Sequence, residues 1–162
     1  MQPDLILQLL FLLLLANGTP VIAKKILGRL YSHPLDGDLS LSDGRPLFGR
    51  SKTIRGVLLA ILVTTAGADL IDLGWRVGLL VGSFAMAGDL VSSFIKRRLD
   101  MPSSSQASVL DQLPESLLPL LACGILLPVT PADIVVCVVL FFIGEVLLSR
   151  VLYVLHLRDR PY

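Results

Sequence analysis

The chain has 162 residues, of which 54% are hydrophobic and only 17% are charged, and its mean hydropathy is +0.77. This composition is too apolar for an ordinary soluble domain, and a formal net charge of +1 says little about partners by itself. We therefore predict an integral membrane protein in which residues 1–162 form a single transmembrane domain, and we expect no nucleic-acid partner.

Five apolar stretches approach the length of a membrane span. Crossing about 30 Å of hydrocarbon takes about 20 mainly apolar residues per helix. We expect helices over residues 4–24, 54–71, 75–95, 110–129 and 131–155. The second stretch is short and the fourth contains acids and prolines, so neighbouring helices must cover the backbone groups that the prolines release. The predicted fold is all-α and polytopic, with five transmembrane helices.

The placement of the bases predicts the orientation of these spans. No base precedes the apolar run at residues 5–16, whereas Lys24 and Lys25 follow it, so we interpret the run as a retained span with the N-terminus outside, not as a signal peptide. With five spans, the regions richest in Lys and Arg share one side, which the positive-inside rule makes cytoplasmic. We expect a multi-pass protein of the cell (inner) membrane with its C-terminus in the cytoplasm.

Two cytoplasmic connections follow from this topology, at about residues 25–53 and 96–109. The first is long and combines Asp-Gly turns with spaced bases, which favours a functional loop. The second contains a run from Pro102 to Gln106 that is typical of a flexible hinge or gate.

The third predicted span contains an acid and ends in three bases. At 100° per residue, one side of this helix carries a polar stripe formed by Asp89, Ser92, Ser93, Lys96 and Arg97. An ionised carboxylate inside a span costs about 2.5–3.5 kcal/mol on insertion scales, so a partner, a metal or a water-filled cavity normally keeps it there. We expect Asp89 to mark the functional site, with a structural ion pair to Lys96 or to an Arg of another span as the alternative. Arg98 falls on the other side, where it would anchor lipid headgroups.

Two more acids are predicted at the same depth. Asp111 and Glu115 are four residues apart, hence on one helical face, and they open the fourth span where Asp89 approaches the end of the third. Three carboxylates on two facing helices could hold a divalent cation, and Mg²⁺ is commonly shared between one or two carboxylates and substrate phosphates. For Glu115, a favourable charge at a helix N-terminus is an equally good explanation.

Bases surround these acids. Lys52 and Arg55 lie in or beside the first loop, and Lys96 and Arg97 close the third span. Acids for Mg²⁺ and bases for phosphate oxygens at a membrane surface point to phosphoryl or nucleotidyl transfer. Asp43, in the same loop, could instead serve only an Asp-Gly turn.

At this point the sequence resembles the CDP-archaeol synthases, a family of small five-span relatives of the phosphatidate cytidylyltransferases. The matching segments are Ala16-Asn17-Gly18-Thr19-Pro20, Asp43-Gly44, Gly49 to Gly56, Gly88 to Arg98, Asp111-Gln112-Leu113 and Tyr153 to Tyr162. They cover nearly the whole chain in the family's order, and the block from Asp89 to Arg98 together with Lys52-Thr53 is the most specific part.

The resemblance implies a Mg²⁺-dependent CTP:lipid-phosphate cytidylyltransferase that forms a CDP-activated lipid and releases pyrophosphate among membrane lipids. The implied catalytic residues are Asp89, Lys96 and Asp111. The implied metal ligands are Asp89 and Asp111, to which the helical spacing of the acids adds Glu115. The residues expected to meet CTP or line the cavity are Asn17, Asp43, Lys52, Thr53, Arg55, Ser93 and Arg97. The oligomeric state is not predicted.

The chain also departs from this pattern. Its last span carries Glu145 and Ser149 where archaeal members tend to have His and Asn, which leaves the lipid phosphate open between an archaeal ether lipid, phosphatidic acid and another lipid. Two other functions remain as alternatives: a small ion or metabolite transporter, and a non-catalytic membrane scaffold.

Overall fold

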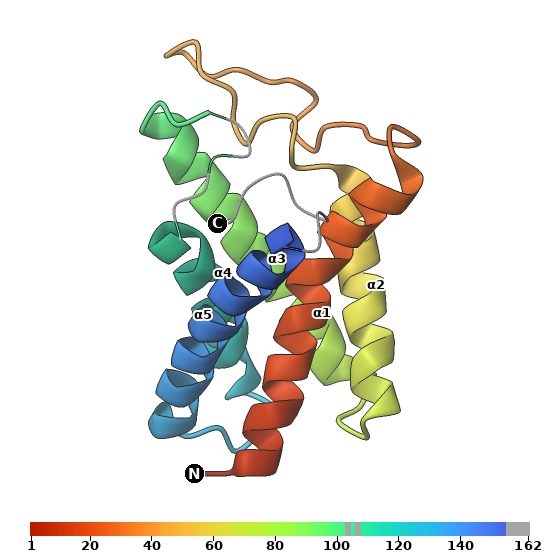
Figure 1. The fold of residues 1–162 in the computed structure, drawn as a ribbon, viewed down its shortest axis with the longest axis vertical. Helices are drawn as coiled ribbons and strands as arrows, with labels where there is room; N and C mark the ends of the chain where they lie inside the picture. The colour runs from red at the N-terminus through yellow and green to blue at the C-terminus, as the bar shows by residue number, and fades with distance from the viewer. Residues whose placement is uncertain (103–104, 106–107, 155–162) are drawn as a thin grey trace.

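The computed structural model describes residues 1–102, 105 and 108–154, and within these residues the fold is all-helical, as predicted (Figure 1). Its five helices are α1 (Pro3–Leu27), α2 (Ile54–Leu70), α3 (Trp75–Arg98), α4 (Ser108–Cys123) and α5 (Pro131–Val154). The hinge predicted from Pro102 to Gln106 lies largely outside the described residues.

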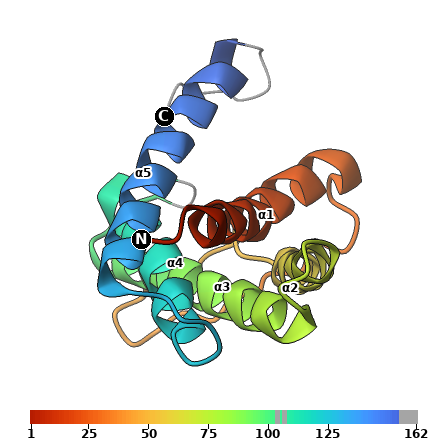
Figure 2. The ribbon, with the colours of Figure 1, turned by 90° about the horizontal axis from the view of Figure 1, so that it is seen from below.

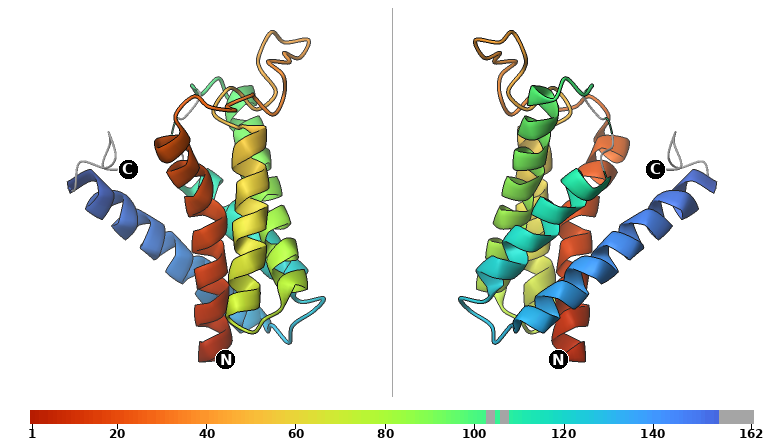
Figure 3. Two further views of the ribbon diagram at one scale, coloured as in Figure 1. Left: turned by 90° about the vertical axis from the view of Figure 1, so that its right-hand side faces the viewer. Right: turned by 90° about the vertical axis from the view of Figure 1, so that its left-hand side faces the viewer.

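Successive helices run in opposite directions, and α1 to α4 form a bundle (Figure 1). Residues 28–53, between α1 and α2, cover one end of this bundle, which we call the loop end. Viewed from the opposite end, α5 extends away from the other helices (Figure 2). Figure 3 shows that α5 meets α1 near the N-terminus and diverges from it toward the loop end.

The hydrophobic core of the bundle is built mainly on α1. Leu9 and Leu12 of α1 are fully buried, together with Val81 of α3 and Leu120 of α4. These apolar side chains fill the centre of the bundle, and the acid and the three bases in the second half of α3 lie toward the loop end.

Two of the helices, α1 and α3, are long and apolar enough to cross a membrane among the residues that the structure describes. The shorter helices α2 and α4 have 17 and 16 residues. The five helices are therefore confirmed, and five membrane spans remain a prediction.

The predicted end of the fourth helix is wrong. We expected a helix over 110–129, but α4 ends at Cys123. Gly124 follows directly, and the amides of Leu126 and Leu127 both turn back to the carbonyl of Cys123, at 3.0 and 2.8 Å. Glycine is favoured after a helix C-terminus and Pro128 cannot extend one, so the chain leaves the helix before its apolar run ends.

Glycines let α3 approach its neighbours closely. A Cβ atom on Gly78 would lie 2.6 Å from the Cβ of Ala68 in α2. On Gly88 it would overlap the carbonyl of Pro114 and lie 2.8 Å from the amide nitrogen of Glu115, both in α4. Small residues at such crossings allow two backbones to touch, as is common between membrane helices. The contact at Gly88 places the residue after it, Asp89, beside Glu115.

We expect Gly88→Ala to destabilise the protein, because the added methyl group meets the α4 backbone, which cannot rotate away. Overpacking of this kind costs about 1–3 kcal/mol. Thermal unfolding in detergent should show a lower midpoint for Gly88→Ala. Gly18→Ala is the matched control, since a Cβ there meets nothing within 4 Å. Equal midpoints for the two variants would contradict the close approach of α3 to α4.

Residues 28–53 form an ordered structure without regular strands. Isolated bridges join Pro34 to Thr53 and Ser40 to Pro46. The amides of Phe48 and Gly49 both donate to Oδ2 of Asp36, each at 2.9 Å. The carboxylate of Asp36 thus holds the turn that leads into Lys52 and α2.

Candidate active site

A cavity of about 370 Å³ opens at the loop end between α1, α2, α3 and residues 28–53. Five of its lining residues are bases: Lys24, Arg29, Arg50, Lys52 and Arg55. Among the described residues, Asp89 is the one acid in its lining. Pro20, Val57 and Met86 add apolar surface from the helices. A cavity with this excess of positive charge suits a ligand that carries several negative charges.

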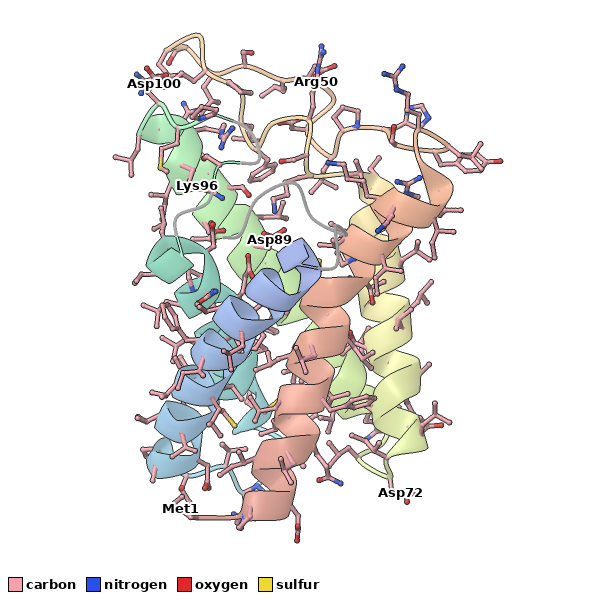
Figure 4. All side chains as sticks on the ribbon, viewed as in Figure 1. Met1, Arg50, Asp72, Asp89, Lys96 and Asp100 are labelled. Atoms are coloured by element: carbon pink, nitrogen blue, oxygen red, sulfur yellow. The ribbon has the colours of Figure 1, made fainter. Side chains whose placement is uncertain are left out.

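Lys52 and Asp89 meet in this cavity. The ammonium group of Lys52 donates to both carboxylate oxygens of Asp89, and both side chains are about one-fifth exposed. Figure 4 places Asp89 on α3 below the loop end. The expected alternative partner of Asp89, Lys96, lies seven residues further along α3, about 10 Å along the axis. The charge partner of Asp89 is therefore supplied by the first loop.

Glu115 is the second carboxylate at this point. It is half-buried on α4, where the close approach of Gly88 to the backbone of Pro114 and Glu115 brings it beside Asp89. Two carboxylates in contact repel each other unless a proton or a cation lies between or beside them. Lys52 supplies one positive charge to the pair, and a divalent cation would supply two.

Lys96, Arg97 and Asp111 form a second charged group nearer the end of α3. The ammonium group of Lys96 lies 2.7 Å from Oδ1 of Asp111, and it donates to the carbonyl of Ser105 at 3.0 Å. Arg97 is buried and donates to the carbonyl of Pro102 at 2.9 Å. The polar stripe predicted on α3 therefore faces α4 and the connection that follows α3.

Two further predicted site residues, Thr53 and Arg55, lie at the start of α2. Thr53 is the N-cap of α2, and its hydroxyl accepts from the amide of Gly56 at 3.1 Å. Arg55 donates to the carbonyls of Leu30 and Gly28, which ties the end of α1 to α2. Both Thr53 and Arg55 line the cavity, as the sequence predicts for residues that meet the substrate.

Asn17, Ser93 and Asp43 are not among the residues that line this cavity. Asn17 donates to the carbonyl of Leu13 at 3.0 Å within α1. Ser93 is buried, and its hydroxyl has no hydrogen-bond partner among the described residues. Asp43 accepts from Arg98 at 2.6 Å. Their roles in binding remain predictions.

The chain is similar to known proteins in both sequence and fold. The sequence model of the CarS-like family, CDP-archaeol synthase, matches residues 67–162. The CDP-archaeol synthase of Pyrobaculum aerophilum is 32% identical over 152 residues, which cover 91% of each chain. That of Pyrobaculum calidifontis is 33% identical over 162 residues, covering 94% of this chain and 96% of the relative. The chain belongs to the CDP-archaeol synthase family.

A solved structure supports this membership. It is described as an intramembrane enzyme for archaeal membrane lipids biosynthesis, and it matches with a TM-score of 0.72 and 27% identity. The match covers 85% of this chain and 90% of that one. The family resemblance inferred from the motifs is thus confirmed.

For this member of the CDP-archaeol synthase family, sequence analysis missed three bases of the cavity: Lys24, Arg29 and Arg50. Lys24 entered the prediction only as a base that follows the first span and indicates its orientation. A signal was present, because Asn17, Pro20 and Lys24 are spaced i, i+3 and i+7 and so share one helical face. Arg50 and Arg29 lie in the irregular segment, where no periodicity assigns a face.

The fit of the site to Mg²⁺ depends on how its acids are grouped. Among the described residues, no group of three or more His, Cys, Asp and Glu side chains could hold a metal ion. The three predicted ligands instead form a pair, Asp89 with Glu115, and a separate acid, Asp111, beside Lys96. A carboxylate pair beside a basic cavity suits Mg²⁺, which often takes one or two carboxylates and completes its shell with waters and phosphate oxygens.

The order of the first loop should depend on acid pH through Asp36. Burial opposes ionisation of Asp36, but the amides of Phe48, Gly49 and Asp38 outweigh it and hold its pKa below the ordinary 3.8. Folding favours the ionised form of Asp36. Its contribution to the stability of the folded loop is therefore complete above pH 3.8 and is lost as the pH falls through the lowered pKa. Hydrogen exchange at Phe48 and Gly49, corrected for intrinsic rates, should show constant protection from pH 8 to 5 and a loss at lower pH. Asp36→Asn should lack that protection at neutral pH.

Proposed function

We propose that the protein is a Mg²⁺-dependent CTP:lipid-phosphate cytidylyltransferase. It joins the CMP part of CTP to a lipid phosphate, forming a CDP-activated lipid and pyrophosphate. The observation that carries this proposal is the cavity with five bases that converges on Asp89, in a chain of the CDP-archaeol synthase family. The site faces the cytoplasm in this proposal, and five helices span the cell membrane, because the loop end carries most of the bases.

The chemistry requires two anions to be brought together. A non-ester oxygen of the lipid phosphate attacks the α-phosphorus of CTP, and the bond from that phosphorus to the bridging oxygen of the β-phosphate breaks. Pyrophosphate leaves with the electron pair of the broken bond. Since the attacking phosphate is already an anion, no strong general base is needed, and catalysis depends on positioning and on neutralising charge.

The bases of the cavity have a direct use in such a reaction. Lys52 and Arg55 lie at the start of α2, and Lys24 and Arg29 approach from the end of α1. Their positive charges would hold the triphosphate and stabilise the departing pyrophosphate. Lys96 and Arg97, near the end of α3, would meet phosphates in place of the carbonyls of Ser105 and Pro102 that they now contact.

The acids would hold the metal. Asp89 and Glu115 are the favoured ligands, and Asp111 lies apart from them beside Lys96. When bound, Mg²⁺ supplies positive charge to the phosphate oxygens and orients the leaving group. Lys52, which now neutralises Asp89, is then available to the phosphates of CTP.

The core argues for an enzyme and against the alternative of a transporter. Leu9, Leu12, Val81 and Leu120 are fully buried between the loop end and the opposite end, so apolar side chains fill the centre of the described bundle. A transporter would instead need polar groups or a cavity near the middle of the membrane.

The lipid substrate can be assigned by a panel of lipid phosphates. Purified protein with CTP and Mg²⁺ should release pyrophosphate with at least one member of a panel containing an archaeal ether-lipid phosphate and phosphatidic acid. The family membership predicts the fastest turnover with the ether lipid. A preference for phosphatidic acid would assign the departures at Glu145 and Ser149 to lipid specificity, and no turnover with any lipid phosphate would refute the proposed function.

A further inference from the structure

The tip of the first loop is attached to the end of α3 by Arg98. Its Nη1 donates to Oδ2 of Asp43 at 2.6 Å, and its Nη2 donates to the carbonyl of Pro46 at 2.6 Å. The guanidinium group also lies over the ring of Phe94, 5.2 Å from the centroid. Arg98 does not line the cavity, so a direct contact with substrate is not its structural role.

Arg45 completes the attachment from the other side. Its guanidinium donates to the carbonyl of Arg98 and lies 3.5 Å from Oδ1 of Asp100. Its amide donates to Oδ1 of Asp43 at 3.1 Å, which turns that carboxylate toward Arg98. We call the contacts among Asp43, Arg45, Pro46 and Arg98 the loop latch.

The loop latch lies on the same stretch of chain as Lys52. The amide of Leu47 donates to the carbonyl of Leu39 at 3.0 Å, and the amide of Lys52 donates to the carbonyl of Gly49 at 3.1 Å. Lys52 itself holds Asp89. Residues 43–52 are therefore joined to α3 twice, at their start by Arg98 and at their end by Asp89.

We propose that Arg98 is a positioning residue, which fixes residues 43–52 against α3 and so holds Lys52 in place for the substrate phosphates. The identity of those phosphates as CTP rests on the proposed function. Without the latch, nucleotide binding must itself order the segment, and that entropic cost weakens binding. The planar fork of arginine reaches Asp43 and Pro46 together, which a lysine cannot do.

The test compares Arg98→Ala, Arg98→Lys and Asp43→Ala with Arg76→Ala. Arg76 is a matched control because its guanidinium also lies over an aromatic ring, that of Trp75 at 5.6 Å, at the opposite end of the bundle. Arg98→Ala should raise the KM for CTP about tenfold, the loss expected from charge-assisted hydrogen bonds, with a smaller change in kcat. Arg98→Lys should fall between Arg98→Ala and the wild type.

A second measurement needs no substrate. Hydrogen exchange of residues 43–52 without CTP should quicken in Arg98→Ala and in Asp43→Ala, and the double variant should add little to either, because the two residues act as one contact. Arg76→Ala should leave both the exchange and the KM unchanged.

Unchanged exchange and unchanged KM in Arg98→Ala would overturn the proposal, as would faster exchange with no effect on the KM. Should Arg98→Ala insert poorly, Arg98→Lys and Asp43→Ala decide the question, since the first keeps the charge and the second leaves α3 unaltered. A wild-type protein without CTP turnover would refute the proposed function. Hydrogen exchange of residues 43–52 would still test whether Arg98 holds the loop latch.

Discussion

Asp89→Asn should lower kcat/KM for CTP by about a hundredfold or more, because it removes a charge from the proposed metal ligand beside the phosphates. Asparagine keeps the shape of the side chain but cannot neutralise Lys52 or complete a carboxylate pair with Glu115. The variant should still insert and purify as the wild type does, since an amide costs less to bury than a carboxylate. Steady-state rates of pyrophosphate release over a range of CTP and Mg²⁺ concentrations measure the effect.

Asp72→Asn is the control for this experiment. Asp72 is exposed at the opposite end of the bundle, where Figure 4 labels it, and asparagine tolerates its positive φ of 60°. It should turn over CTP at the wild-type rate. Near-normal turnover by Asp89→Asn would make Asp89 a structural partner of Lys52, and the site would have to be sought elsewhere.

Lys52→Met should slow the turnover of CTP but strengthen the binding of a divalent cation. Turnover of CTP should fall about a hundredfold, because the cavity loses a base that we propose to bind the phosphates. Binding of Mn²⁺ without nucleotide should tighten by about tenfold or more, since the Asp89–Glu115 pair loses its nearby positive charge. Titration of free Mn²⁺ by electron paramagnetic resonance measures the second effect independently of activity.

Lys25→Met provides the comparison for Lys52→Met. Lys25 is an exposed base at the end of α1 and does not line the cavity. Its loss should change neither turnover nor Mn²⁺ binding. If Lys52→Met bound Mn²⁺ no better than the wild type, then Lys52 would not share its position with the metal, and the assignment of Asp89 as a ligand would lose its support.

The helices could be predicted from the sequence because their boundaries have local causes. Thr53 caps α2 with its own hydroxyl, and the start of α2 was predicted at the observed residue. The end of α4 was missed because hydropathy continues to residue 129, while Gly124 ends the helix regardless of hydropathy. Local turn chemistry outweighed the apolar pattern there.

The site could be predicted only in part. Helical periodicity placed Asp89 on the polar stripe, and Asp111 at the start of α4, but it offered Lys96 as a partner for Asp89. The actual partner, Lys52, comes from an irregular loop whose path depends on Asp36 and Arg98. Contacts between segments far apart in the chain leave no periodic signal, so the loop latch was absent from the prediction.

We propose that this site joins CMP to a lipid phosphate. The most direct measurement follows CTP labelled at its α-phosphorus, incubated with purified protein, Mg²⁺ and an ether-lipid phosphate in detergent micelles. We predict that label enters the lipid fraction in a one-to-one ratio with released pyrophosphate, and that neither product forms without the lipid phosphate. Pyrophosphate release with no labelled lipid, or no consumption of CTP with any lipid phosphate, would contradict the account.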